Sequence, residues 1–144
     1  MGRILAIDYG TKRTGIAVTD PHQRIASPLE TVPTHDLMLY LDDYVARENV
    51  EALVVGRPLR LDGSDSQSMR PLTFFVNALR KRLPHLRVEW VDERFTSRMA
   101  QAALVEGGMK KSKRREKGAL DKVSAALILQ SYLDGKNNLH PGVL

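Results

Sequence analysis

Three carboxylates stand at places where a sequence of this kind can build a site. Asp8 and Glu93 each follow a predicted strand, and Asp121 lies near the start of the predicted last helix. Each has an ordinary explanation alone: a turn former, a surface ion pair with Arg94, and a favourable partner of the helix dipole. Together they form a set of oxygen ligands, which Mg²⁺ and Mn²⁺ prefer.

Such a set suits hydrolysis of a phosphodiester bond. With two metal ions about 3.5–4 Å apart, one activates the attacking water and the other stabilises the leaving oxygen. We therefore predict a Mg²⁺ or Mn²⁺ site, with two ions, held by Asp8, Glu93 and Asp121. The four histidines are scattered without ligand spacing, so we assign none of them to metal binding or catalysis.

Asp92 competes with Glu93 for the second position. If the strand continues through both residues, period-two alternation puts their side chains on opposite faces of the sheet, so only one faces the site.

Positive charge is concentrated close to these acids. Lys12 and Arg13 follow Asp8 within five residues, and a second cluster precedes Asp121. The members of that cluster that we expect to contact phosphates are Lys110, Lys111, Lys113, Arg114 and Arg115. A solvated loop without a partner is the alternative explanation. With a net charge of +5 and a sequence pI of about 9.7, we predict a nucleic-acid partner whose binding weakens with added salt.

Composition is that of an ordinary globular protein. The chain has 144 residues, of which 42% are hydrophobic and 27% charged. It has no cysteine, which excludes disulfides and thiolate zinc sites. We find no leader segment and no membrane-spanning stretch, and expect a cytoplasmic protein. We expect one domain over residues 1–136 and a C-terminal tail over 137–144.

Hydrophobic patterns predict three strands, then helices alternating with strands. The strands are 3–7, 14–19, an edge strand at 24–32 broken by Pro28, 52–55 and 87–91. The helices are one capped by Thr34, one over 66–83 after a loop at 59–65, one from Thr96 or Ser97 to about 105, and one over 120–133. This order predicts an α/β fold with a mixed five-stranded sheet, three antiparallel strands followed by parallel ones, flanked by helices. Its functional groups should gather at the carboxyl ends of the strands.

Four blocks of sequence resemble one known family along nearly the whole chain. They are IDYGTKRTGIA from Ile7, VVGRPL from Val54 with Asp62-Gly63-Ser64, VDERFTS from Val91, and DKVSAALILQ from Asp121. In these blocks the chain resembles the YqgF or RuvX proteins of the ribonuclease H-like superfamily, which are Holliday-junction-resolvase-like.

The resemblance implies a ribonuclease H-like fold and a catalytic set at Asp8, Glu93 and Asp121. It also implies a role in processing the 5′ end of the 16S ribosomal RNA precursor, with activity on single-stranded or branched DNA in some relatives. Family members usually have Leu where this chain has Arg57. We assign no function to that position.

Two other functions fit parts of the sequence. The segment Asp8–Thr11 is also typical of the phosphate loop of actin-like ATPases, but a second such segment is absent. A catalytically silent RNA-binding protein is the other alternative, although carboxylates repel a phosphate backbone unless metal neutralises them. A junction resolvase should dimerise whereas a trimming nuclease need not, so the sequence leaves monomer and homodimer open.

Overall fold

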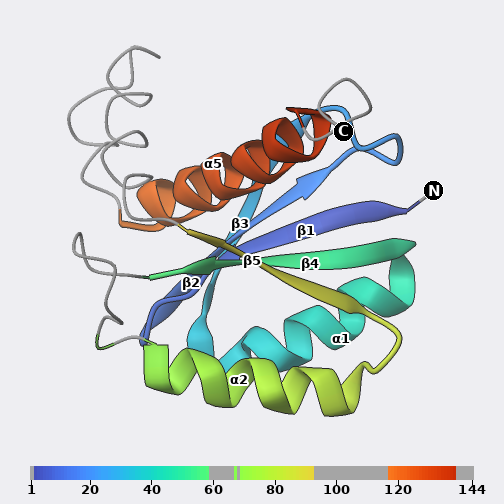
Figure 1. The fold of residues 1–144 in the computed structure, drawn as a ribbon. Helices are drawn as coiled ribbons and strands as arrows, with labels where there is room; N and C mark the ends of the chain where they lie inside the picture. Colours follow the sequence, from blue (N-terminus) through green and yellow to red (C-terminus); the bar gives the residue numbers. More distant parts are fainter. Residues whose placement is uncertain (1, 59–66, 68, 93–116, 139–144) are drawn as a thin grey trace.

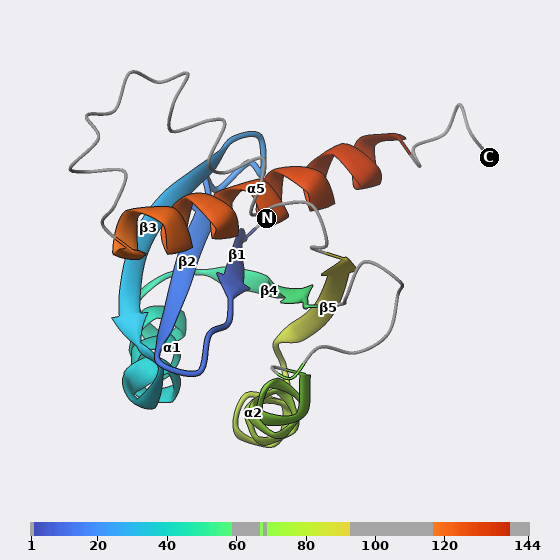
Figure 2. The same cartoon turned by 90° about the vertical axis from the view of Figure 1, so that its left-hand side faces the viewer.

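The described part of the chain forms one sheet with helices on both faces (Figure 1). The structure is a computed structural model that describes residues 2–58, 67, 69–92 and 117–138. The five strands lie in the order β3-β2-β1-β4-β5. Figure 2 shows helix α5 on one face of the sheet and helices α1 and α2 on the other.

The first three strands form the predicted antiparallel meander. They are β1 (Arg3–Asp8), β2 (Arg13–Thr19) and β3 (Ala26–Pro33). β3 is an edge strand, as Pro28 indicated, and its register with β2 shifts between Ile16 and Ala17. Proline donates no hydrogen bond to a ladder, so its place at an edge and beside an irregularity is the expected one.

The later strands run parallel to β1, which confirms the predicted mixed sheet. They are β4 (Val50–Arg57), which pairs with β1, and β5 (Arg87–Asp92), which pairs with β4. Helix α1 (Leu37–Arg47) precedes β4 and helix α2 (Met69–Arg82) precedes β5. Helix α5 (Lys117–Asn138) extends beyond the predicted 120–133 at both ends.

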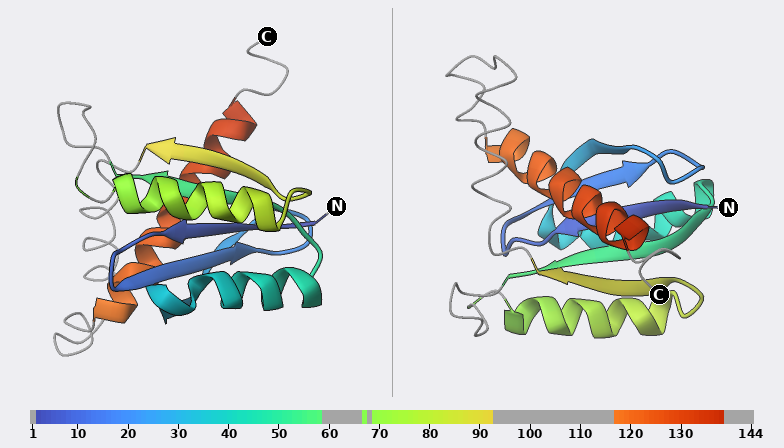
Figure 3. Two further views of the ribbon diagram at one scale, coloured as in Figure 1. Left: turned by 90° about the horizontal axis from the view of Figure 1, so that it is seen from below. Right: turned by 45° about the horizontal axis from the view of Figure 1, so that its top comes forward.

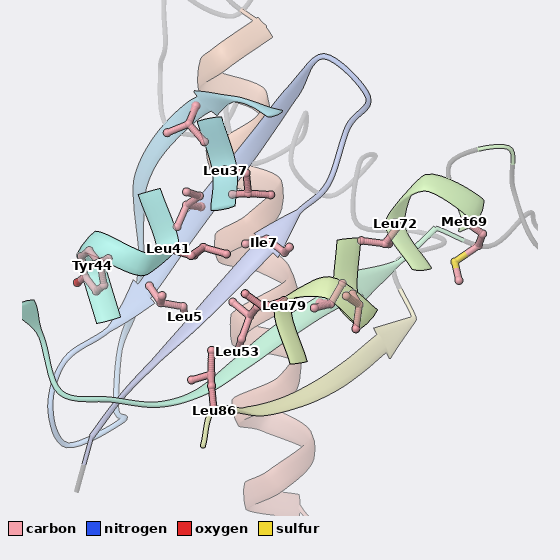
Figure 4. Close-up of a cluster of buried hydrophobic side chains, with 14 residues drawn as sticks. Leu5, Ile7, Leu37, Leu41, Tyr44, Leu53, Met69, Leu72, Leu79 and Leu86 are labelled. Carbon is pink, nitrogen blue, oxygen red and sulfur yellow. The ribbon is translucent and has the colours of Figure 1, made fainter. Parts of the chain in front are cut away.

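Alternation along β1 divides the core into two clusters. Leu5 and Ile7 pack toward α1 and α2, with large neighbours such as Leu41 and Leu79 (Figure 4). The opposite cluster, under α5, has small residues on the sheet and on the helix: Ala6, Ala17, Ala52 and Ala125. Small side chains let the helix axis approach the strands closely, and α5 packs chiefly on β2, β3 and β1.

The predicted helix cap at Thr34 is wrong. Thr34 begins a short 3-10 turn (Thr34–Asp36), α1 starts at Leu37, and no side chain makes a cap hydrogen bond there. The Thr34 hydroxyl donates instead to the carbonyl of Gly10 and shares a hydrogen bond of 3.0 Å with Thr14. The Thr34 hydroxyl, which local preference would use to cap the helix, is therefore bonded to the β1–β2 turn.

Several predicted segments fall outside the described residues: the loop at 59–65, the helix to about residue 105, and the end of the tail. Within the described ranges, none of the helices combines the length and the apolar character needed to cross a bilayer.

Candidate functional site

Two of the candidate acids, Asp8 and Asp121, lie at one edge of the sheet. The carboxyl ends of the parallel strands β1, β4 and β5 lie there, together with the first turns of α2 and α5 (Figure 1). Asp8 is the last residue of β1, and Asp121 lies near the start of α5. The edge is therefore the one where an open α/β sheet places its chemistry.

Asp8 lies on the face of the sheet that α5 covers. Ile4 and Ala6 of the same strand belong to the cluster under α5, so the period of two puts the Asp8 side chain on that face as well. The residue is half-buried. Its carboxylate is thus at the end of the strand, on the side of the helix that carries Asp121.

Gly15 lies next to both Asp8 and Asp121. It is the residue of β2 opposite Asp8, where paired Cα atoms of antiparallel strands lie about 4.5–5.5 Å apart. A Cβ on Gly15 would lie 2.0 Å from the backbone oxygen of Asp121 and 2.2 Å from its carbonyl carbon. Two of the three predicted acids are therefore brought together at this glycine, because only a residue without a side chain lets α5 come so near.

Arg13 contacts Asp121 directly. Its Nε donates a hydrogen bond of 2.8 Å to Oδ2 of Asp121, and both side chains are partly exposed. Arg13 and Gly15 share a face of β2, which explains how both meet α5. The structure places the Arg13 guanidinium on a predicted metal ligand, where it balances the carboxylate charge, and a contact of Arg13 with phosphate stays a prediction.

Lys12 lies exposed in the turn between β1 and β2. The turn is tight, because a Cβ on Gly10 would lie 2.4 Å from the carbonyl oxygen of Arg13. It is also held from the side: the Thr34 amide donates to the carbonyl of Lys12 over 2.9 Å. Sequence reasoning missed this support from Thr34, which keeps Lys12 beside Asp8.

Tyr9 anchors the same turn to α2. Its ring packs against Phe75, with 5.7 Å between ring centroids, and burial raises the pKa of its hydroxyl. The turn that follows Asp8 is therefore fixed on both sides, by Thr34 and by α2.

Asp92 lies on the other face of the sheet. In β5, Val91 packs under α5 whereas Trp90 packs toward α1 and α2, so alternation puts Asp92 on the α2 side. Its partner across the β4–β5 pair is Arg57, which shares that face. Asp92 is thus away from Asp8 and Asp121, which favours Glu93 as the acid contributed after β5.

The remaining predicted site residues lie outside the described residues: Glu93 and the basic residues Lys110, Lys111, Lys113, Arg114 and Arg115. Within the ranges that the structure describes, no group of three histidine, aspartate or glutamate side chains is placed to hold a metal ion. Asp8 and the backbone of Asp121 both lie next to Gly15, and carboxylate oxygen atoms are of the type that Mg²⁺ and Mn²⁺ bind.

Comparison with known proteins gives consistent results. Residues 2–135 match the model of the RuvX family, described as Holliday junction resolvase. A protein of Phocaeicola vulgatus is 53% identical over 94% of this chain and 98% of its own length, and one of Porphyromonas gingivalis is 55% identical over 93% and 97%. Both relatives carry the name "Putative pre-16S rRNA nuclease".

A solved structure shares the fold. The RuvC protein of T. thermophilus, in complex with a Holliday junction substrate, matches with a TM-score of 0.58 over 95% of this chain and 96% of that one, at 16% sequence identity. The likeness supports the predicted ribonuclease H-like α/β fold. Since the family model spans nearly the whole chain and the relatives are half identical to it, this chain belongs to the RuvX family.

Proposed function

We propose that this protein is a nuclease that uses Mg²⁺ or Mn²⁺ to hydrolyse phosphodiester bonds at the edge formed by β1 and α5. The observation that carries the proposal is the approach of Asp8 and Asp121 across Gly15. The names of the half-identical relatives point to the 16S ribosomal RNA precursor as the substrate.

Each acid has a distinct place in the proposed site. Asp8 supplies oxygen ligands from the sheet and Asp121 supplies them from the helix, with Glu93 as the third acid. Bound there, a pair of divalent ions would activate water and neutralise the charge that develops on the leaving oxygen.

Two cations of this chain lie next to the candidate acids and have different proposed roles. Arg13 holds Oδ2 of Asp121 and fixes the direction of that carboxylate. Lys12, exposed on the turn next to Asp8, is placed to contact a backbone phosphate as a mobile point charge.

A silent RNA-binding protein explains this arrangement less well. Two carboxylates at one end of the sheet would repel an RNA backbone unless a metal ion neutralised them, which is the arrangement that a nuclease needs. A branched DNA substrate is a second candidate, because the family model that matches is described as Holliday junction resolvase.

The test is cleavage by the wild type and by Asp8→Asn, with Asp92→Asn as the matched control. Asp92 also ends a strand at this edge but lies on the opposite face. The substrates are single-stranded RNA carrying a 16S leader sequence, single-stranded DNA and a four-way junction, each with Mg²⁺, Mn²⁺ or EDTA. We expect Asp8→Asn to slow cleavage by at least about 100-fold and Asp92→Asn to keep it near the wild-type rate.

Equal cleavage by wild type and Asp8→Asn would contradict the proposal, and so would cleavage that persists in EDTA. The preferred substrate follows from the ratio of rates on the three nucleic acids.

A further inference from the structure

The exposed side of α2 carries a row of cations and one aromatic ring. Arg70, Phe74, Asn77 and Lys81 follow one another at spacings of four, three and four residues, so they form a single stripe along the helix. All four are exposed, and Phe74 is 68% accessible to solvent. We call these four residues the α2 stripe.

Charge on α2 has one sign. The helix contains Arg70, Arg80, Lys81 and Arg82 and no acidic residue. Arg82 pairs with Asp42 of α1, whereas the other three make no ion pair with the described residues. The helix dipole explains cations in the last turn but opposes Arg70, which stands in the first turn. Helix stability therefore does not account for Arg70.

Phe74 adds a flat apolar surface between these cations. A single exposed hydrophobic residue is common and needs no explanation. An aromatic ring flanked on one stripe by Arg70 and Lys81 is more specific, because single-stranded nucleic acids present bases that stack on rings and phosphates that bind cations.

The α2 stripe begins at the same end of the sheet as the candidate site, although α2 covers the opposite face from Asp8. Phe75, next to Phe74, packs on Tyr9, which directly follows Asp8. The first turn of α2 lies at the edge where β1 and β4 end (Figure 3). From Arg70 to Lys81 the stripe is about 16 Å long at the usual rise of a helix. A single strand that leaves the site around this end of the sheet would meet Arg70 first and then run along α2 past Phe74.

We infer that the α2 stripe binds a single-stranded segment of nucleic acid that flanks the cleavage position. Phe74 stacks on a base, and Arg70 and Lys81 contact phosphates on either side of it. The inference rests on the proposed function for the identity of the partner.

The first test is binding without cleavage. Fluorescence anisotropy in EDTA measures the affinity for oligouridylates of about 4 and about 20 nucleotides, which span the usual range of single-strand site sizes. We expect Phe74→Ala to weaken binding of the longer strand about tenfold, and Phe74→Tyr, which keeps a ring, to restore it. The shorter strand should be affected less, because it can bind without reaching the stripe.

Leu39→Ala is the matched control. Leu39 is 67% exposed on α1, on the same side of the sheet, but its helix carries Asp42 and Asp43 and no basic stripe. Its affinity for both strands should equal that of the wild type.

The salt dependence separates stacking from charge. Replacing both Arg70 and Lys81 by Gln should reduce the slope of log affinity against log salt by about 1.4, since each phosphate contact to a single strand contributes about 0.7. Phe74→Ala should leave that slope unchanged while lowering affinity at every salt concentration.

Three results would overturn the inference: Phe74→Ala binding like Leu39→Ala, Phe74→Tyr failing to restore affinity, or an unchanged slope in the double variant. These binding results do not depend on Asp8. Failure of the nuclease proposal would instead appear as equal cleavage by wild type and Asp8→Asn.

Discussion

Gly15 has no side chain at the point where β2 meets α5. The backbone of Asp121 occupies the space that a Cβ would need, and Asp8 lies opposite on β1. The contact involves backbone atoms of a helix, which cannot withdraw as the tip of a flexible side chain can. Any substitution at this glycine must move α5.

Gly15→Ala should therefore destabilise the protein, by about 3 kcal/mol, and also separate the candidate acids. Urea denaturation measures the first effect and cleavage of single-stranded RNA the second. Gly135→Ala, in α5, is the control, because nothing lies within 4 Å of its added Cβ. That variant should gain about 0.5–1 kcal/mol from helix propensity. If Gly15→Ala were as stable as Gly135→Ala, the close approach would be wrong.

Individual acids could be proposed from the sequence, but their neighbours could not. Asp8 is recognisable because it ends an apolar run. The contact between Arg13 and Asp121 joins residues 108 positions apart, so no local pattern predicts it. Gly15 gave one usable signal, since glycine inside a strand often marks close approach of another backbone.

Helix α5 depends on small residues beneath it. Ala6, Ala17 and Ala52 on the strands and Ala125 on the helix are fully buried. The opposite face uses leucine, isoleucine and valine under α1 and α2. The distance between α5 and the sheet is thus set by the size of a few residues.

Ala17→Leu should raise α5 from the sheet and displace Asp121, because Ala17 lies on the same face of β2 as Gly15. We expect a loss of about 1–3 kcal/mol in the free energy of unfolding. RNA cleavage should fall much further than that loss explains.

Leu41→Ala provides the comparison, since it creates a cavity under α1 at a cost of about 2–5 kcal/mol while leaving the α5 face intact. Cleavage by folded Leu41→Ala should stay near the wild-type rate. Equal loss of cleavage in both variants would show that cleavage does not depend on the distance between α5 and the sheet.

Element types were predictable where periodicity was strong. The strands and α2 were found because their apolar residues repeat cleanly. The predicted last helix stopped at Leu133, its final apolar position, whereas α5 continues through polar residues to Asn138. Hydrogen bonding along a helix does not require apolar residues, so a hydrophobic pattern underestimates its length.

All four tyrosines of the chain lie partly inside the molecule. Burial is the main cause that raises the pKa of Tyr9, Tyr40, Tyr44 and Tyr132, and the Glu30 carboxylate adds to the shift at Tyr40. In the unfolded chain these hydroxyls ionise near pH 10. Between that pH and the higher folded pKa, the folded protein binds more protons than the unfolded one.

The free energy of unfolding should therefore be insensitive to these groups below about pH 9 and fall as the pH rises through 10 and above. Urea denaturation across that range checks the prediction. Tyr40→Phe should make the fall shallower, because Tyr40 has the largest shift and phenylalanine does not ionise. If the free energy of unfolding fell as steeply with pH in Tyr40→Phe as in the wild type, Tyr40 would not contribute to the pH dependence.

The directions of the strands followed from the alternation of elements, because connection rules restrict it to few arrangements, whereas the strand order β3-β2-β1-β4-β5 came from the structure. Glu93 and the basic cluster before α5 lie outside the described residues, so their places in the site remain predictions.

The pairing of Arg13 with Asp121 also bears on protein synthesis. The candidate site needs both β2 and α5, and Asp121 is translated 108 residues after Arg13. While the segment between them is being made, the nascent chain has Asp8 but not its helical partner. A site built in this way cannot assemble until α5 has left the ribosome and packed on the sheet, so activity of the proposed nuclease is a late event in folding.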